Sequence, residues 1–282
     1  MKPVAKDYVD AHHHVWKIER DDYGWLTPEL EPIYRDFSLK DLAPLSEWAN
    51  VETHVLVQAA PTFAETKYLL DVATESEGKV RGVVGWVDLA SRNAIPTLTR
   101  LSRERFFKGV RPMLQDLPDA DWILRKEVQS ALAALPRLGL RLDALIKPPH
   151  LRALLAVIES HPDLAIVIDH AAKPAIAAGM WEPWAGLIRA ASQSPKVRCK
   201  LSGLPNEAGP DWTIDTLRPY VDHVFECFGP DRIMWGSDWP VVELGGGYKR
   251  WRAATVALLQ HLGPEERDAV LGGTARRFYG LD

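Results

Sequence analysis

Residues 151–170 read Leu-Arg-Ala-Leu-Leu-Ala-Val-Ile-Glu-Ser-His-Pro-Asp-Leu-Ala-Ile-Val-Ile-Asp-His and hold one copy of the pattern that decides the fold. In the first half, leucine and isoleucine recur at the i, i+3, i+4, i+7 spacing of one helical face. Pro162 must interrupt this helix. The run Leu164–Asp169 that follows is almost continuously apolar, as in strands buried on both faces. The stretch therefore predicts a helix followed by a buried parallel strand.

The same alternation of apolar runs and helical periodicity extends along the whole chain of 282 residues. The predicted strands are Tyr8–Val15, Thr53–Ala59, Val80–Asp88, Phe106–Leu114, Leu140–Lys147, Leu164–His170, Val197–Gly203 and Arg232–Asp238. Eight strand–helix units predict a single-domain (β/α)8 barrel, of the TIM-barrel type, over residues 1–282. The alternative is a doubly wound open sheet. That fold normally carries a phosphate-binding glycine motif, which this sequence lacks.

Composition excludes several classes of function. The formal net charge is -4 and no basic run occurs, so nucleic acid and anionic membranes are not expected partners. No apolar run approaches the roughly 18 residues that a membrane span needs. Two cysteines, and a first segment Met1–Tyr8 without an apolar core, predict a soluble cytoplasmic protein. The sequence does not indicate an oligomeric state.

Polar side chains end three of the predicted strands. His12 and His14 end the first strand, and residues two apart share one face of a strand. His170 ends the sixth strand and Asp238 ends the eighth. In a (β/α)8 barrel, the carboxyl ends of the strands form one mouth. We therefore expect His12, His14, His170 and Asp238 to converge as the catalytic group.

Two kinds of site suit these four side chains. Three imidazoles and a carboxylate can ligate one divalent ion, such as zinc or manganese. A metal-free site, in which Asp238 takes a proton from water and the histidines orient the substrate, suits them equally. His13 points to the other face of the first strand and is interpreted as a packing residue. The remaining histidines are interpreted as structural or exposed.

Six further residues are candidates for substrate binding. Arg111 ends the fourth strand and Lys200 ends the seventh; their alternative roles are a salt bridge and a strand cap. The four aromatic candidates are Trp16, Tyr23, Trp25 and Trp239. Tyr23 and Trp25 lie in the connection Lys17–Leu42, which is long enough to form a lid. Their alternative role is to anchor this loop to the barrel rim.

Seven motifs in one order carry a resemblance that runs almost end to end. They are Asp10-Ala-His-His-His-Val-Trp16, Tyr23-Gly-Trp25-Leu26, Gly109-Val-Arg111, Asp169-His-Ala-Ala-Lys-Pro174, Cys199-Lys-Leu-Ser-Gly203, Gly236-Ser-Asp-Trp-Pro-Val241 and Gly273-Thr-Ala-Arg-Arg-Phe-Tyr279. The chain resembles the amidohydrolase superfamily, in particular its lactonase branch with hydrolases of the L-fuconolactonase type. The resemblance implies that His12 and His14 are the first-strand pair, His170 the later histidine and Asp238 the general base. It also implies that Arg111 holds substrate oxygens.

The resemblance implies hydrolysis of a small sugar-derived lactone, such as L-fuconolactone or L-rhamnonolactone, by Asp-assisted attack of water. Binuclear relatives need a lysine or glutamate on a middle strand and a second later histidine. Lys147 is the nearest lysine, but no partner histidine lies near Lys200, so two metals are not expected. Three alternatives stay open: a lactonase for pyrone or muconolactone dicarboxylates, a metal-dependent decarboxylase of the same superfamily, and a non-catalytic sugar-acid binding protein.

Overall fold

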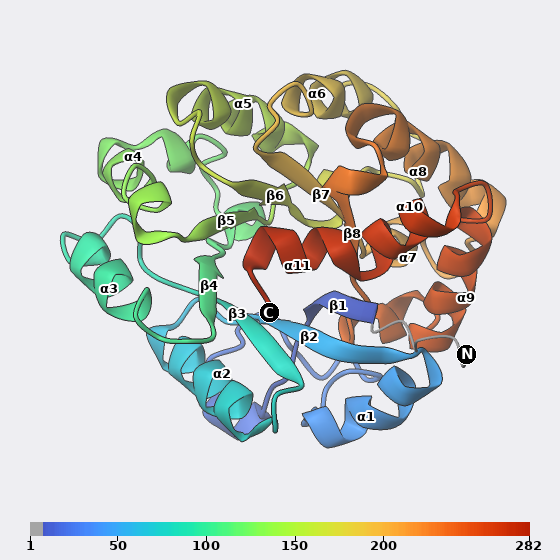
Figure 1. Ribbon diagram of the computed structural model, residues 1–282, viewed down its shortest axis with the longest axis horizontal. Helices are drawn as coiled ribbons and strands as arrows, with labels where there is room; N and C mark the ends of the chain where they lie inside the picture. The colour runs from blue at the N-terminus through green and yellow to red at the C-terminus, as the bar shows by residue number, and fades with distance from the viewer. Residues whose placement is uncertain (1–7) are drawn as a thin grey trace.

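A computed structural model describes residues 8–282 and contains one sheet of eight parallel strands in the order β1 to β8. The strands are β1 (Tyr8–His13), β2 (Val51–Val57), β3 (Val80–Gly85), β4 (Phe107–Val110), β5 (Arg141–Ala144), β6 (Ile166–Ile168), β7 (Val197–Leu201) and β8 (Ile233–Trp235). Helices surround the ring of strands (Figure 1). Every predicted strand is present; seven are shorter than predicted, and β2 keeps the predicted length but begins two residues earlier. The polar residues at the predicted carboxyl ends mostly belong to loops.

The segment that follows β8 closes the ring against β1. His13 forms a parallel bridge with Trp239. The backbone N–H of Asp238 donates to the carbonyl of His12 at 2.8 Å, and that of His14 donates to Trp239 at 2.7 Å. These bonds confirm the predicted barrel and exclude the open sheet. They also hold Asp238 beside the two histidines of the first strand.

Helices surround the barrel (Figure 1). They are α1 (Leu39–Trp48), α2 (Phe63–Glu75), α3 (Ala94–Leu101), α4 (Lys126–Leu132), α5 (Leu151–Ser160), α6 (Trp184–Ala191), α7 (Leu204–Ala208), α8 (Ile214–Phe228), α9 (Tyr248–Leu258), α10 (Pro264–Asp268) and α11 (Thr274–Tyr279). Those up to α8 lie between successive strands, and α9 to α11 follow β8. Within residues 8–282, no helix combines the length and the apolar composition that crossing a bilayer requires.

Helix α11 covers one end of the barrel (Figure 1). Phe278 and Tyr279 pack there in one buried cluster with apolar strand residues, including Val9 and Val55. Val9 is the second residue of β1, so α11 covers the end of the barrel where this strand begins. The carboxyl ends, where enzymes with this fold place their chemistry, remain free for a site.

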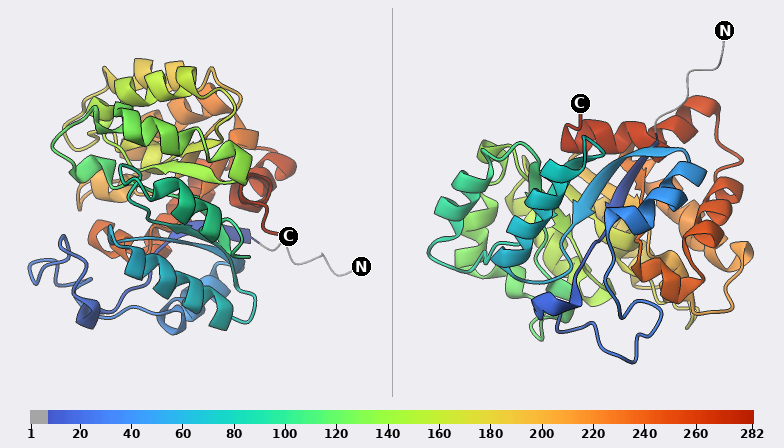
Figure 2. Two further views of the ribbon diagram at one scale, coloured as in Figure 1. Left: turned by 90° about the vertical axis from the view of Figure 1, so that its left-hand side faces the viewer. Right: turned by 90° about the horizontal axis from the view of Figure 1, so that it is seen from below.

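The long first connection projects at the opposite end of the barrel from α11, as the right-hand view of Figure 2 shows. Trp16 and Phe37 form an antiparallel bridge at its base, with two backbone hydrogen bonds of 3.0 Å. Residues 39–42 of the predicted lid belong instead to the first turn of α1. Ser38 caps that turn, which ends the loop.

Candidate active site

A bulge in β1 turns two histidines toward the barrel mouth. Asp10 pairs with His54 and His13 pairs with Leu56, so three residue steps of β1 run against two of β2. Val9 and Ala11 pack with the apolar cluster that α11 covers. Strict alternation from these two residues would aim His12 and His14 at the outer helices. The extra residue reverses the alternation, and both imidazoles face the mouth instead.

The structure brings the four predicted catalytic side chains together. Oδ1 of Asp238 lies 3.5 Å from Nε2 of His14. The same oxygen lies 3.7 Å from Nε2 of His12 and 3.8 Å from Nε2 of His170. All four side chains are buried. One carboxylate oxygen therefore faces three imidazole nitrogens, each just beyond hydrogen-bond distance.

An uncommon backbone turn positions His170. Residues 170–173 all have left-handed backbone angles, with φ of 52°, 50°, 61° and 49°. None is glycine, and such angles cost energy in other residues. The indole N–H of Trp184 donates to the carbonyl of Ala171 at 2.7 Å and supports the turn. The turn brings His170 to Asp238 and leaves Lys173 at the wall of the cavity.

Hydrogen bonds fix how two of the imidazoles face the centre. Nδ1 of His14 lies 2.7 Å from the carbonyl of Val57, which can only accept. Nδ1 of His14 therefore carries the proton, and its Nε2 presents a lone pair toward Asp238. Nδ1 of His170 bonds to the hydroxyl of Ser202 at 2.8 Å. A histidine that ligates a metal through one ring nitrogen typically forms a hydrogen bond through the other, as Nδ1 of His14 and Nδ1 of His170 do here.

The spacing of these atoms fits a divalent cation. His12, His14 and Asp238 offer ligand atoms within 4.8 Å of one another. The nitrogen–oxygen separations of 3.5–3.8 Å leave room for an ion bound at about 2.0–2.2 Å to each ligand. The donor set of imidazoles and one carboxylate is also a zinc-type set.

Burial and neighbouring groups set the protonation of the site. Burial alone would raise the pKa of Asp238, but the facing imidazoles, His170 first, hold its pKa below the usual range. Burial lowers the pKa of His170 to about 4 and lowers those of His12 and His14 as well. At neutral pH an ionised carboxylate therefore faces neutral imidazoles, which is the state a general base requires.

A buried column of charge lies beneath His12. Nζ of Lys200 is 2.6 Å from Oδ2 of Asp143, 3.0 Å from Oδ1 of Asp169 and 3.1 Å from Nδ1 of His12. The hydroxyl of Tyr279 donates to Asp143 at 2.6 Å. Burial opposes ionisation of Asp169, but Lys200 and then His12 hold its pKa well below the usual value.

This position does not fit the expectation that Lys200 contacts the substrate. Its side chain is fully buried, and it is absent from the lining of the cavity at the mouth. Two carboxylates inside the barrel need a counter-charge, and Lys200 supplies it. Its link to the chemistry runs through His12, whose Nδ1 it contacts.

A cavity of about 150 Å³ opens beside Asp238. Its lining consists of His14, Trp25, Ala59, Arg111, Met113, Gln115, Asp116, Leu145, His170, Lys173, Asp238 and Val241. Of the six predicted substrate-binding residues, Arg111 and Trp25 line it. Arg111 is also tied into the barrel, since its guanidinium donates to the carbonyl of Gln58 and to Asp169. Both roles weighed for Arg111 are therefore compatible with its position.

The other aromatic candidates lie behind the cavity wall. Trp16 is fully buried and meets Trp25 edge to face, with ring centroids 5.6 Å apart. Tyr23 packs on Trp16 at 6.3 Å, and Trp239 packs on Phe37 at 5.1 Å. These three rings support the wall and the loop base, which is the anchoring role considered for Tyr23. The indole N–H of Trp25 donates to the carbonyl of Ala59 at 2.7 Å, which fixes it at the cavity.

Two residues near the cavity escaped the sequence analysis. Lys173 lines the cavity, and its own motif, Asp169–Pro174, was the available signal. Glu65 lies on α2, where it resembles the acid of a helix capping box with Thr62. Its carboxylate instead accepts the backbone N–H groups of Ala59 and Ala60. Glu65 thereby fixes the turn at Ala59, and the carbonyl of Ala59 accepts the indole N–H of Trp25.

We expect Glu65→Gln to flatten part of the dependence of stability on pH. Burial raises the pKa of Glu65 from 4.5 to about 7, against the lowering effect of the two N–H groups. The native state then binds more protons than the unfolded state between these values, so stability falls as pH rises from 4.5 to 7. Glutamine has no such titration. Relative to the wild type, the variant should gain about 3 kcal/mol over this range.

Urea unfolding at several pH values measures this gain. Glu75→Gln, on the exposed side of the same helix, is the matched control and should follow the wild type. Parallel curves for the wild type and Glu65→Gln across pH 4.5–7.5 would contradict the raised pKa.

Comparison with known proteins identifies the family behind this geometry. Residues 9–281 match the amidohydrolase family. The chain belongs to this family. The amidohydrolase is 45% identical over 278 residues to an L-fucono-1,5-lactonase of Burkholderia ambifaria, covering 97% of this chain and 96% of the relative. It is 31% identical to an L-fucono-1,5-lactonase of Burkholderia multivorans, covering 97% and 96% of the two chains.

Solved structures agree with this assignment. The amidohydrolase superimposes on a crystal structure of an amidohydrolase from Burkholderia multivorans with bound zinc, with a TM-score of 0.91 and 31% identity. The superposition covers 98% of this chain and 100% of the other. The zinc belongs to that relative. His12, His14 and Asp238 of this amidohydrolase fit a divalent cation on their own geometry, and Nε2 of His170 lies 3.8 Å from Oδ1 of Asp238.

Proposed function

We propose that this amidohydrolase opens the lactone ring of a sugar-derived acid by Asp-assisted attack of water. The observation that carries the proposal is an ionised Asp238 that faces three imidazoles at the edge of a cavity. The identity of 45% to an L-fucono-1,5-lactonase makes L-fucono-1,5-lactone the first substrate to test, and L-rhamnonolactone the next.

The reaction transfers an acyl group to water. Asp238 accepts a proton from water while the water oxygen bonds to the lactone carbonyl carbon. Arg111 donates to the negative oxygen of the tetrahedral adduct, and one well-aimed donor is worth roughly 3–4 kcal/mol of barrier. The ring C–O bond then breaks. The proton on Asp238 passes to the leaving ring oxygen, which gives a hydroxyl and a carboxylic acid.

His12, His14, His170 and Asp238 are the residues that would hold a divalent ion, and zinc is the ion we propose first. Such an ion, when bound, polarises a carbonyl and lowers the pKa of water. The protein's own contribution is to orient the imidazoles through Val57, Ser202 and Lys200. The buried mouth also shields the base from bulk water.

The cations at the cavity favour a neutral lactone over a dicarboxylate. Arg111 and Lys173 are the cationic side chains among the described residues that line it. The charge of Arg111 is already paired with Asp169, and only the N–H groups that do not bind Asp169 or Gln58 can donate to a ligand oxygen. Lys173 lies 3.8 Å from Glu207, a loose pair that leaves its ammonium free to bind one ligand oxygen. A dicarboxylate would need more free positive charge than this cavity offers.

We expect Lys173→Met to raise KM for the lactone by about 10-fold to 100-fold while kcat changes less. A hydrogen bond from an ammonium to a ligand oxygen is worth about 1.5–3 kcal/mol. Steady-state kinetics measures the split between KM and kcat. Lys147→Met, at an exposed position, is the matched control. An unchanged KM in Lys173→Met would remove this residue from the binding site.

A screen of aldonolactones with a pH indicator, run with and without a chelator, tests the proposed function. Proton release with a sugar lactone supports it. Release of carbon dioxide from an aromatic acid would identify a decarboxylase, and turnover confined to pyrone or muconolactone dicarboxylates would identify the other lactonase class. Tight binding of sugar acids without turnover of any lactone would indicate a non-catalytic sugar-acid binding protein. We also propose a cytoplasmic location, since Cys199 and Cys227 are buried free thiols.

A further inference from the structure

A second group of metal-ligating side chains lies behind the first strand. Asp10, His13 and His54 each offer one ligand atom, and these atoms lie within 4.8 Å of one another. Asp10 and His13 are fully buried, and His54 is 4% exposed. The rings of His13 and His54 meet edge to face at 4.9 Å. His13 points away from the side of β1 that carries His12 and His14, so this group is separate from the active site.

Four polar atoms of this group lack partners, although Oδ1 of Asp10 accepts the backbone N–H groups of His12 and Ser237. Oδ2 of Asp10, both ring nitrogens of His13 and Nδ1 of His54 make no hydrogen bond among the described residues. Leaving a buried donor or acceptor unsatisfied costs about 1–3 kcal/mol, and native proteins rarely leave several together. His13 was interpreted from the sequence as a packing residue. Its two unsatisfied nitrogens indicate a different role.

We propose that Asp10, His13 and His54 bind a second divalent cation of the zinc class. Two imidazoles and one carboxylate are ligands that zinc prefers. Neutral imidazoles offer lone pairs, and a carboxylate offers negative charge. No ion pair joins Asp10 to a lysine or arginine within residues 8–282. A cation would satisfy all three side chains at once, which no single neutral donor could do.

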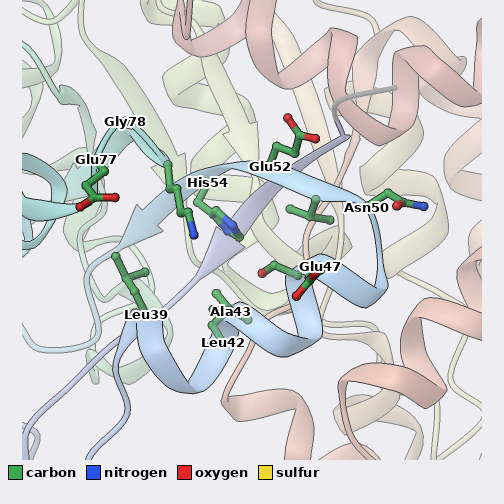
Figure 3. Close-up of a pocket in the computed structure, with 12 residues that line it drawn as sticks. Leu39, Leu42, Ala43, Glu47, Asn50, Glu52, His54, Glu77 and Gly78 are labelled. Carbon is green, nitrogen blue, oxygen red and sulfur yellow. The ribbon is translucent and has the colours of Figure 1, made fainter. Parts of the chain in front are cut away.

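A wide cavity gives this group a route to solvent. The cavity has a volume of about 640 Å³ and lies between α1 and β2, with His54 in its lining (Figure 3). Glu47, Glu52 and Glu77 also line it, against one cation, Lys79. A hollow with excess negative charge raises the local concentration of cations.

The position of the group suggests what the cation does. Asp10 and His13 bracket the bulge of β1, and His54 is the partner of Asp10 on β2. A cation on these three residues would tie the two strands together at the bulge. The bulge aims His12 and His14 at the barrel mouth. The cation therefore acts as a structural clamp behind the active site.

Counting metal ions in a variant without the first site tests the proposal independently of lactonase activity. The test protein is His170→Asn/Asp238→Asn, stripped with a chelator, dialysed and titrated with zinc. We expect about one ion per chain by elemental analysis, together with a rise in Tm of several degrees. Adding His54→Gln should abolish both the ion and the rise in Tm.

His150→Gln, at a buried histidine outside the group, is the matched control and should keep both effects. His13→Gln repeats the test if His54→Gln does not fold. An equal zinc count and equal rise in Tm with and without His54→Gln would overturn the proposal. A crystal structure of the wild type in excess zinc provides a check without mutation. Anomalous density between Asp10, His13 and His54 would support the site, and a water or an empty gap there would overturn it.

Discussion

Asp238→Asn is expected to lower kcat for lactone hydrolysis by about 1000-fold while the protein still binds the lactone. General-base catalysis contributes roughly 100-fold to 10000-fold, and asparagine cannot accept the proton of water at neutral pH. Asparagine keeps the shape of the side chain. The cavity beside it and the buried rings behind it should therefore be unchanged.

Initial rates in a pH-stat and lactone affinity by calorimetry measure the two effects separately. Zinc content must be recorded for both proteins, because Asp238 is also a candidate ligand. Asp116→Asn, at an exposed carboxylate of the same cavity, is the matched control. Turnover by Asp238→Asn equal to that of the wild type would discard the proposed mechanism. Loss of binding together with turnover would assign Asp238 to the substrate or metal site alone.

Lys200→Met is expected to lower the free energy of unfolding by about 3–5 kcal/mol at pH 7. The substitution keeps much of the volume but leaves Asp143 and Asp169 buried without their counter-charge. Breaking a buried ion pair from one side typically costs this much, because the remaining charge stays desolvated. The effect should exceed that of any exposed lysine in the chain.

Urea unfolding measures the loss, and Lys196→Met at an exposed position provides the matched control. The double variant Lys200→Met/Asp143→Asn should recover part of the stability, since it also removes one of the stranded charges. A loss below 1 kcal/mol in Lys200→Met would show that water or protonation stabilises Asp143 and Asp169 without the lysine. Failure of the double variant to recover stability would assign the loss to packing.

The fold could be predicted because its signals are local and repeated. Each buried strand reads as an apolar run, and each helix repeats one periodicity, so eight units add up to a barrel. The strand ends were predicted too long. The predicted strands run past the last ladder bond into turns such as residues 169–173, and the left-handed backbone of residues 170–173 leaves no trace in hydropathy.

The candidate site could be predicted only in part. Strand order places His12, His14, His170 and Asp238 at one mouth, and the structure brings them together. The role of Lys200 depends on Asp143 and Asp169, which are distant in sequence.

The path of the first loop sets which aromatic rings reach the cavity. Trp16 turns its indole N–H to the carbonyl of Arg35, and Trp25 turns its own to Ala59. Side-chain type alone could not distinguish these two. The unsatisfied nitrogens of His13 were equally hidden, because they depend on a bulge that periodicity does not reveal.

The position of α11 after the eight strands in the sequence affects how the interior of the barrel forms during folding. It emerges from the ribosome after all eight strands, yet it supplies the hydroxyl of Tyr279 to Asp143. Until it docks, water can enter the open end of the nascent barrel and solvate the charges under His12. When α11 docks, it excludes this water from the interior of the barrel beneath His12. We therefore expect the support beneath His12 to be complete only after α11 has docked.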